Sequence, residues 1–239
     1  VVLGSMDIVW AFMIDIVTAI LAVAILALIP LEKVVRTDTP VSILADLKQG
    51  IEYTFHRPLL RGLIACFACS FFLITPAAIL TPLLVERTFG DEVWRLTANE
   101  IVWTVGSLIG GIYVSLRGKF DDKIRTIAYC LVAFGISFGL LGVAGNFILY
   151  LLIMGTAGFF MPIITTAQTV FIQEIVEPGM LGRVFSIIQF ISASAMPTAI
   201  LLFGPLADVI SVQTILLSSG VLLALVGLVY ERSSRTISH

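Results

Sequence analysis

The chain has 239 residues, of which 59% are hydrophobic and 13% charged, and its mean hydropathy is +1.07. A water-soluble domain has roughly a quarter of its residues charged, so this composition excludes an ordinary soluble fold and indicates a protein whose solvent is lipid. The net charge is −2. Because no basic patch with interleaved aromatic residues is present, the sequence does not indicate a nucleic-acid partner.

The sequence begins without an initiator methionine, and no basic stretch or small-residue cleavage site precedes the first apolar segment. This pattern argues against a signal peptide. We therefore expect the sequence to begin partway through a larger protein.

Seven segments are long and apolar enough to cross a bilayer as helices, for which about 20 residues are needed. In chain order they are Ser5–Ile29, Leu60–Val85, Ile101–Leu116, Thr126–Ala144, Phe147–Ile172, Val184–Leu206 and Val209–Tyr230. The third is the least clear, because its uncharged part is short and Glu100 stands at its outer end. Only Ala207 and Asp208 separate the last two, which predicts a tight hairpin. We predict an all-α, polytopic membrane protein with about seven transmembrane helices.

The distribution of Lys and Arg among the loops predicts the orientation, because cytoplasmic loops are enriched in these residues. Alternate connections form a basic set with Lys33, Arg36, Lys48, Arg57, Arg61, Arg117, Lys119, Lys123, Arg125, Arg183, Arg232 and Arg235. The opposite set holds only Arg87 and Arg95. This alternation supports seven spans, with the N-terminus outside the cell and the C-terminus in the cytoplasm.

The one long connection, Pro30–Leu59, carries the signs of an amphipathic helix. Thr39 and Pro40 suit an N-cap and a first helical turn. Apolar residues then recur every four positions, at Ile43, Leu47, Ile51 and Phe55. The spacing predicts a helix at the inner membrane surface or against the protein; a partly ordered linker is the alternative.

One span, a long connection and six further spans are what remains when a transporter of two six-helix halves is divided before its sixth helix. On this interpretation residues 1–30 are the last helix of the N-terminal half and residues 31–59 the cytoplasmic linker. Residues 60–231 are the C-terminal six-helix bundle, and residues 232–239 are a cytoplasmic tail.

Several short stretches stand in an order typical of one family. They are Met13-Ile14-Asp15, Ala27-Leu28-Ile29-Pro30, Asp46-Leu47-Lys48-Gln49-Gly50, Pro82-Leu83-Leu84-Val85, Gln173-Glu174, Leu181-Gly182-Arg183-Val184-Phe185-Ser186 and Gly204-Pro205-Leu206-Ala207-Asp208. Over essentially its whole length the chain resembles the major facilitator superfamily, and more narrowly its bacterial macrolide-efflux-type drug exporters. The resemblance implies a twelve-helix transporter of which this chain is the C-terminal portion.

The superfamily's cytoplasmic signature, G-x-x-x-D-R-x-G-R-R, has a degraded copy that begins at Gly111. Ser115 and Leu116 replace its Asp and first Arg, which removes the acid of the usual gating ion pair. The resemblance implies a cytoplasmic gate formed by Arg117, Gly118, Lys119 and Arg183. For Arg183 the alternative is a topology anchor only.

Prolines interrupt three of the predicted spans: Pro76 and Pro82 in the second, Pro162 in the fifth, and Pro197 and Pro205 in the sixth. Each removes a backbone donor, which is tolerable only beside protein or a water-lined cavity. By analogy with the family these are the seventh, tenth and eleventh helices, which line the transport cavity and bend there. The alternative is that prolines are simply frequent in membrane helices.

Asp15 is the only acidic side chain well inside a predicted span, at a cost of about 2.5–3.5 kcal/mol near a helix centre. We interpret it as the proton-coupling residue. Pairing with a basic group in the missing half is a second functional interpretation. A structural hydrogen bond or a position near the headgroups is the alternative, because the sixth helix of the family is usually peripheral.

An apolar wall with sparse polar groups suits a large amphipathic drug. The candidate substrate-binding residues are Phe72, Thr75, Phe160, Thr165, Gln168, Gln189 and Phe190. Helix–helix packing is the competing account of the polar ones. Trp94 and Trp103 are interpreted as markers of the outer interface.

No metal site, cofactor or enzymatic site is predicted. Cys66 and Cys69 form a C-x-x-C without a second Cys or His pair, so with Cys130 they are interpreted as packing residues. His56 lies in the linker and His239 is terminal, and no H-E-x-x-H or paired intramembrane carboxylates are present.

Taken with the resemblance, the sequence predicts an exporter of macrolide-like compounds in the bacterial inner membrane, working by proton antiport and alternating access. Its expected partners are a small-molecule substrate, protons, the lipid bilayer and the missing N-terminal half. The alternatives are another substrate, such as a lysophospholipid or metabolite, and a truncated half that does not transport alone.

Overall fold

A computed structural model of the protein describes residues 8–28 and 43–238, and within these ranges all regular structure is helical. The helices are α2 (Ile8–Leu28), α3 (Ile43–His56), α4 (Pro58–Phe89), α5 (Val93–Arg117), α6 (Lys123–Leu141), α7 (Phe147–Ile175), α8 (Leu181–Val209) and α9 (Val212–Ser238). The chain divides into two compact units, Val1–Val41 and Ser42–His239, and each is described by itself.

The described part of the first unit is the helix α2. Its described large hydrophobic side chains are exposed on all sides, from Val9 to Leu26, and a helix that is apolar all round requires lipid or protein as its surroundings. The hydroxyl of Thr18 donates to the carbonyl oxygens of Ile14 (3.0 Å) and Asp15 (2.9 Å). The proposed cap at Thr39 and Pro40 lies outside the described residues.

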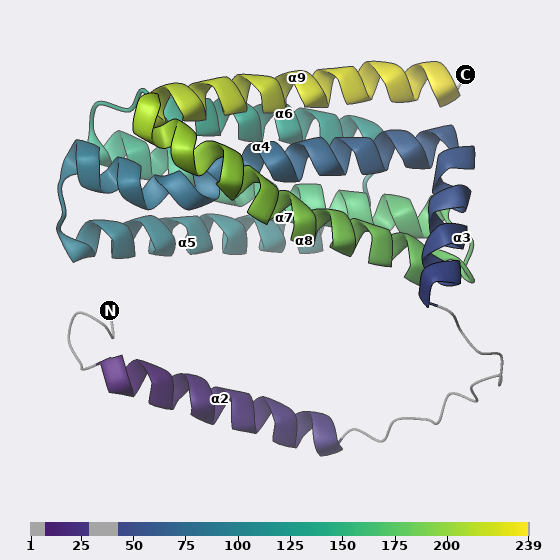
Figure 1. The fold of residues 1–239 in the computed structure, drawn as a ribbon, viewed down its shortest axis with the longest axis horizontal. Coiled ribbons are helices and arrows are strands. Elements are labelled where there is room, and N and C mark those ends of the chain that lie inside the picture. Colours follow the sequence, from purple (N-terminus) through teal and green to yellow (C-terminus); the bar gives the residue numbers. More distant parts are fainter. Residues whose placement is uncertain (1–7, 29–42, 239) are drawn as a thin grey trace. The chain divides into compact units, whose positions relative to one another are not determined.

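In the second unit the long helices run up and down a common axis, and α3 lies across one end of them (Figure 1). We call this the α3 end; it also holds the α5–α6 turn, the α7–α8 connection and the last turns of α9. The far end holds the turns α4–α5, α6–α7 and α8–α9. Successive connections therefore alternate between the two ends, as the distribution of basic residues predicts.

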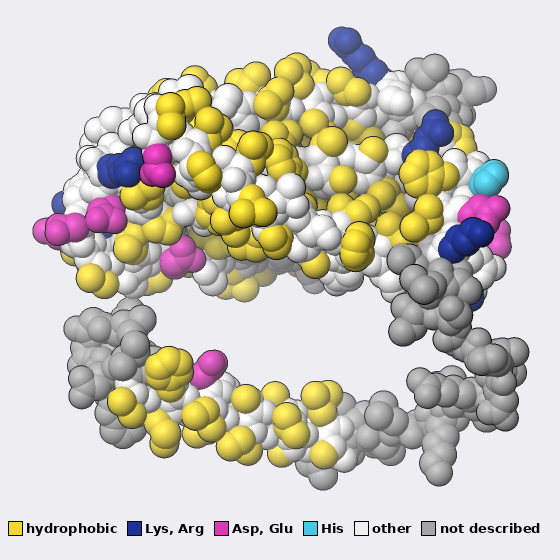
Figure 2. Space-filling view, viewed as in Figure 1, with side chains coloured by type: hydrophobic (Ala, Val, Ile, Leu, Met, Phe, Trp, Pro, Cys, Tyr) yellow, Lys and Arg dark blue, Asp and Glu magenta, His cyan; other side chains and the backbone are white. Residues whose placement is uncertain are grey.

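Five described helices are long and apolar enough to cross a membrane: α4, α6, α7, α8 and residues Val212–Arg235 of α9. Helix α5 has 25 residues but is not among them, because Asn99, Glu100 and several glycines dilute its apolar residues. The apolar stretch Phe12–Ala27 of α2 is shorter. In Figure 2 hydrophobic side chains cover the face of the second unit, while most charged side chains gather toward its two ends.

The turn between the last two helices differs from the sequence prediction. Helix α8 continues through Ala207 and Asp208 to Val209, and the chain turns at Ile210 and Ser211. The turn is tight, but α8 and α9 do not pack as a hairpin, since α9 packs mainly against α6 and α4. Helix α9 also continues to Ser238, so the predicted tail is largely helical.

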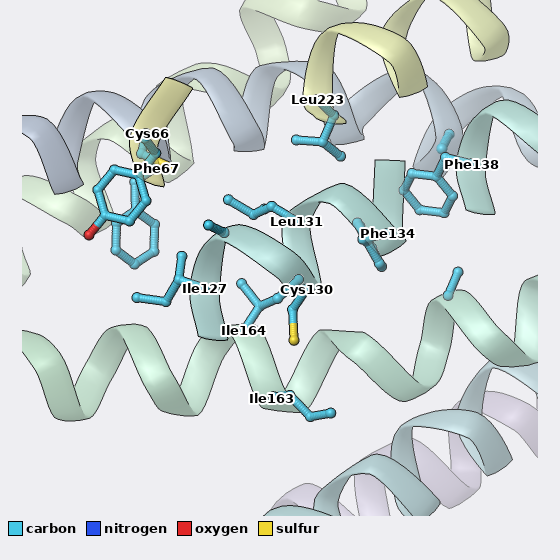
Figure 3. Close-up of a cluster of buried hydrophobic side chains, with 14 of the residues drawn as sticks. Cys66, Phe67, Ile127, Cys130, Leu131, Phe134, Phe138, Ile163, Ile164 and Leu223 are labelled. Carbon is cyan, nitrogen blue, oxygen red and sulfur yellow. The ribbon is translucent and has the colours of Figure 1, made fainter. Parts of the chain in front are cut away.

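Helix α6 forms the centre of the core. It packs against α9 on one side and α7 on the other, and Figure 3 shows Leu131 and Phe134 of α6 between these helices. Leu131, Phe134 and Tyr150 are fully buried. Lipid tails are as apolar as these side chains, so close van der Waals packing rather than water exclusion must hold the helices together.

Glycines let the helix backbones approach closely at two interfaces. A Cβ atom built at Gly135 of α6 would lie 2.6 Å from the carbonyl oxygen of Gly220 in α9, and one at Gly220 would lie 2.5 Å from that of Gly135. At the α5–α7 interface, a Cβ at Gly106 would overlap the carbonyl oxygen of Gly155. Alanine therefore does not fit at these positions without moving a helix.

We predict that Gly106→Ala destabilises the protein by about 1–3 kcal/mol, because the added methyl group separates α5 from α7. Gly111→Ala is the matched control on the same helix: no atom lies within 4 Å of its Cβ position, so the change should be neutral or stabilise by up to about 1 kcal/mol. Thermal unfolding of the purified protein in detergent measures both. Equal melting temperatures for the two variants would contradict this packing.

Candidate functional site

Two of the predicted substrate-binding residues lie together in a groove between α4 and α8. The groove has a volume of about 430 Å³. It is lined by Ala68, Cys69, Phe72, Phe190, Ile191, Ser194, Ala195 and Thr198. We call it the α4–α8 groove; its walls are apolar except for the hydroxyl groups of Ser194 and Thr198.

The ring of Phe72 is half-buried and packs against Phe203 of α8, with 5.5 Å between the ring centroids. Phe190 is 64% exposed. Cys69 and Phe72 also line a second apolar groove of about 510 Å³ between α4 and α9. The two grooves therefore meet at Cys69 and Phe72.

The other predicted binding residues do not join this groove. Thr75 is buried, and its hydroxyl donates to the Phe71 carbonyl oxygen (2.8 Å). Gln168 is buried in α7, while Thr165 and Gln189 are exposed. Phe160 is half-buried and contacts Phe159 edge-on at 5.4 Å.

Threonines beside the prolines bond back to the helix. Thr75 and Thr81 directly precede Pro76 and Pro82, and each hydroxyl donates to the carbonyl oxygen four residues earlier. Thr198 follows Pro197 and donates to the Ser194 carbonyl oxygen (2.7 Å). Such bonds tend to bend helices, and they lie beside Pro76 and Pro82 in α4 and beside Pro197 in α8.

Pro162 interrupts the hydrogen-bond ladder of α7, and a neighbouring helix compensates for it. Proline has no N–H to donate to the carbonyl oxygen of Gly158, four residues earlier. That oxygen accepts instead from the hydroxyl of Ser107 in α5 (3.2 Å). The bond joins α5 to α7 at their glycine-mediated contact.

A mainly apolar pocket with a few polar side chains lies between α4, α5, α6 and α7, and the sequence did not predict it as a site. It has a volume of about 310 Å³, and Glu100 and Asn99 of α5 line it together with Thr81 of α4. Trp103 also lines it, is half-buried and packs against Phe134 and Phe138, whereas its assignment to the outer interface stays a prediction. The signal in the sequence is the pair Asn99 and Glu100 directly before an apolar segment, a pattern that also marks the edge of a span.

At the α3 end, an arginine ties α3 to the α7–α8 connection. Arg57 forms an ion pair with Glu177 and donates to the Ile175 carbonyl oxygen (3.2 Å). Its guanidinium lies 4.4 Å from the centre of the Tyr53 ring, and the Tyr53 hydroxyl accepts from the Glu177 N–H (3.2 Å). These residues were not predicted as a gate.

The predicted gate residues lie at the same end but make other contacts. Arg117 is exposed and donates to the Tyr113 hydroxyl (2.6 Å). Gly118 ends α5 with φ = +71°, a conformation that favours glycine. Lys119 is exposed, and Arg183 is half-buried with its guanidinium on the Met180 sulfur (3.3 Å).

Helices are joined at the α3 end by a further ion pair, between Lys123 of α6 and Glu174 of α7 (3.0 Å). At the far end, Glu92 accepts hydrogen bonds from Trp94 and Arg95, each at 2.9 Å. The hydrogen bond from Arg95 lowers the pKa of Glu92, so this carboxyl stays ionised. Charge pairing is therefore concentrated at the two ends of the bundle.

Asp15 is exposed on α2. Of the three cysteines, Cys66 and Cys130 are buried in the core, and Cys69 is exposed in the groove. Within the described residues no group of three or more His, Cys, Asp and Glu side chains could hold a metal ion.

The family model described as Major Facilitator Superfamily matches residues 1–200 of the chain. The chain belongs to the major facilitator superfamily. Its sequence is thus that of a multi-pass bacterial membrane protein in a family of transporters, which are not enzymes.

Curated relatives of this superfamily member are efflux proteins. Macrolide efflux protein A of Streptococcus pyogenes is 29% identical over 222 residues, which cover 90% of this chain and 54% of the relative. Macrolide efflux protein A of Enterococcus faecalis is 28% identical, over 77% of this chain and 58% of the relative. Multidrug efflux pump Tap of Mycolicibacterium fortuitum is 21% identical, over 95% and 55%. The chain spans about half the length of the curated relatives it matches.

We predict that Ser107→Ala destabilises this family member by about 0.6–1.7 kcal/mol, because the Gly158 carbonyl oxygen loses its donor inside the bundle. Ser115→Ala, at an exposed position on the same helix, is the control and should change stability little. Chemical unfolding in mixed micelles distinguishes the two. A chemical unfolding curve of Ser107→Ala that coincides with the control would show that the Gly158 oxygen needs no donor.

Proposed function

We propose that the chain forms one wall of a drug exporter, which carries amphipathic compounds such as macrolides across the bacterial inner membrane by alternating access. The observation that carries the proposal is the α4–α8 groove, in which Phe72 and Phe190 flank an apolar surface. A groove of about 430 Å³ is large enough to hold part of an amphipathic compound. The efflux relatives support the same class of cargo.

The groove suits a substrate that is held mainly by shape and apolar contact. Its polar groups are sparse, and the hydroxyl of Thr198 already bonds to the Ser194 carbonyl oxygen. A site without a dense set of fixed hydrogen-bond partners discriminates weakly among apolar compounds of similar size. This chemistry fits a transporter of several related drugs better than one of a single metabolite.

Movement of the wall would come from the helices that line it. Helices α4 and α8 each contain two prolines, and the threonine back-bonds beside them favour bending. In secondary transporters such bends occur near the substrate site, and one half rocks against the other. We propose that α4 and α8 bend at these prolines as access alternates.

We place the α3 end in the cytoplasm, together with the C-terminus. Most of the described basic residues lie at this end, in its connections and helix ends or in α3. They are Lys48, Arg57, Arg61, Arg117, Lys119, Lys123, Arg125, Arg183, Arg232 and Arg235. Arg87 and Arg95 belong to the far end. Cytoplasmic loops carry such an excess. The gate would then include Arg57–Glu177 and Lys123–Glu174 beside the predicted Arg117, Lys119 and Arg183.

Export would be driven by proton antiport, with Asp15 as the proposed coupling residue. An acid inside an apolar helix can alternate between a neutral and a charged form. Asp15→Asn should therefore abolish gradient-driven export in energised vesicles. Undiminished export by this variant would rule out Asp15 as the coupling residue.

The main test is the accumulation of a radiolabelled macrolide in cells that express the protein from its complete gene. Expression should lower accumulation, and an uncoupler should restore it. Phe72→Ala and Phe190→Ala should each weaken export roughly tenfold, because each removes a large apolar contact surface. Leu140→Ala is the control: this leucine is 45% exposed but lines a different groove, between α6 and α9.

Accumulation that is the same with and without the gene would contradict the proposal for macrolides. Equal losses in Phe72→Ala, Phe190→Ala and Leu140→Ala would show that the α4–α8 groove is not the binding surface.

A further inference from the structure

The pocket between α4, α5, α6 and α7 contains a carboxylate, Glu100, that is not part of the α4–α8 groove. Glu100 lines the pocket and is exposed. Within the described part of the chain no Lys or Arg forms an ion pair with it. A carboxylate in a membrane-spanning bundle requires a compensating positive charge or a proton.

A chain of hydrogen bonds holds this carboxylate in place. The Tyr150 hydroxyl donates to the Asn99 side-chain oxygen (3.0 Å), and the Asn99 side-chain nitrogen donates to Glu100 Oε1 (3.1 Å). Tyr150 is fully buried, and Asn99 is 1% exposed. The ring of Tyr150 in turn packs against the rings of Phe89 and Phe147, which also contact each other. A rigid, buried support therefore orients Glu100 at the rim of the pocket.

The pocket reaches from the far end toward the middle of the bundle. Glu100 is seven residues after the start of α5, which puts it about 10 Å along that helix. Met161 is fourteen residues after the start of α7, at about 21 Å. Glu100, Ala78 and Pro82 are its exposed lining residues, while Asn99, Phe134, Phe138 and Met154 are buried. The mouth is thus between α4 and α5, and the floor is apolar.

The walls favour an organic cation over a bare proton. The ring of Trp103 attracts cations through its negative face. Met154 and Met161 add polarisable thioethers, which adapt to irregular apolar groups. A proton needs only the carboxylate and would gain nothing from these walls. The volume of about 310 Å³ fits an amine-bearing arm rather than a whole large drug.

We propose that this pocket binds the protonated amine of an amphipathic substrate, with Glu100 as its counter-ion and Asn99 and Tyr150 as positioning residues. The assignment rests on the proposed export function and narrows its substrate class to amphipathic compounds that carry a basic amine. The apolar body of the substrate then lies outside the pocket, beyond its mouth between α4 and α5.

A binding experiment tests the pocket without requiring transport. The probe is radiolabelled benzyltrimethylammonium, titrated into the purified complete protein in detergent, with neopentylbenzene as the uncharged analogue of the same shape. We expect the cation to bind saturably, and the uncharged analogue to displace it only poorly. Glu100→Gln should raise the dissociation constant of the cation at least about tenfold, while Glu100→Asp should keep it within about threefold of the value for the unchanged protein. Glu86→Gln, at an exposed acid near the far end of α4, should leave it unchanged.

Export selectivity provides the second test. For a macrolide with a tertiary amine, Glu100→Gln should reduce export at least about tenfold. For its uncharged derivative, in which the amine is demethylated and acetylated, the same variant should have little effect.

The proposal is overturned if Glu100→Gln binds the cation as the unchanged protein does, or if it reduces export of both compounds equally. If the unchanged protein exports neither compound, the proposed export function is refuted instead. The binding experiment would still show whether the pocket binds the cation through Glu100.

Discussion

The bilayer demands that every backbone polar group find its partner inside the protein, and the rest of the structure depends on this constraint. All described regular structure is helical, because a helix satisfies its own peptide groups. The prolines break that rule locally. At Pro162 the Gly158 carbonyl oxygen loses its helical donor and accepts a hydrogen bond from the Ser107 hydroxyl of the neighbouring helix α5 instead. A broken ladder is thus tolerated where a neighbouring helix is close enough to repair it.

That closeness depends on glycine. Without a hydrophobic force between helices in lipid, contact has to come from shape. Gly106 and Gly158 bring the backbones of α5 and α7 together at the place where Ser107 reaches across. Gly135 and Gly220 do the same for α6 and α9. By contrast, α4 packs only loosely against α5, although the two helices are consecutive, and the Glu100 pocket opens between them.

The two candidate sites differ in chemistry and share one helix. The α4–α8 groove is apolar and exposed, whereas the Glu100 pocket has a carboxylate held by Asn99 and Tyr150. Helix α4 contributes to both, with Phe72 toward α8 and Thr81 toward the pocket. Bending of α4 at Pro76, which lies between these two residues, would alter both surfaces together. This arrangement offers a physical route by which binding at one surface affects the other.

The sequence by itself determined the helical class, the alternation of the loops and the approximate extent of the long helices, because length, hydropathy and charge are local properties. The sequence also predicted Phe72 and Phe190 as binding residues, and the structure shows that both line the α4–α8 groove. The tertiary structure decided that α9 packs against α6 and α4 rather than α8, that Arg57 contacts Glu177, and that Trp103 lies beside Phe134. Glu100 is a candidate site only because Tyr150, 51 residues after Asn99 in the sequence, donates a hydrogen bond to Asn99, which in turn donates to Glu100. Such contacts between distant residues depend on which helix faces lie opposite one another, and local periodicity does not encode that.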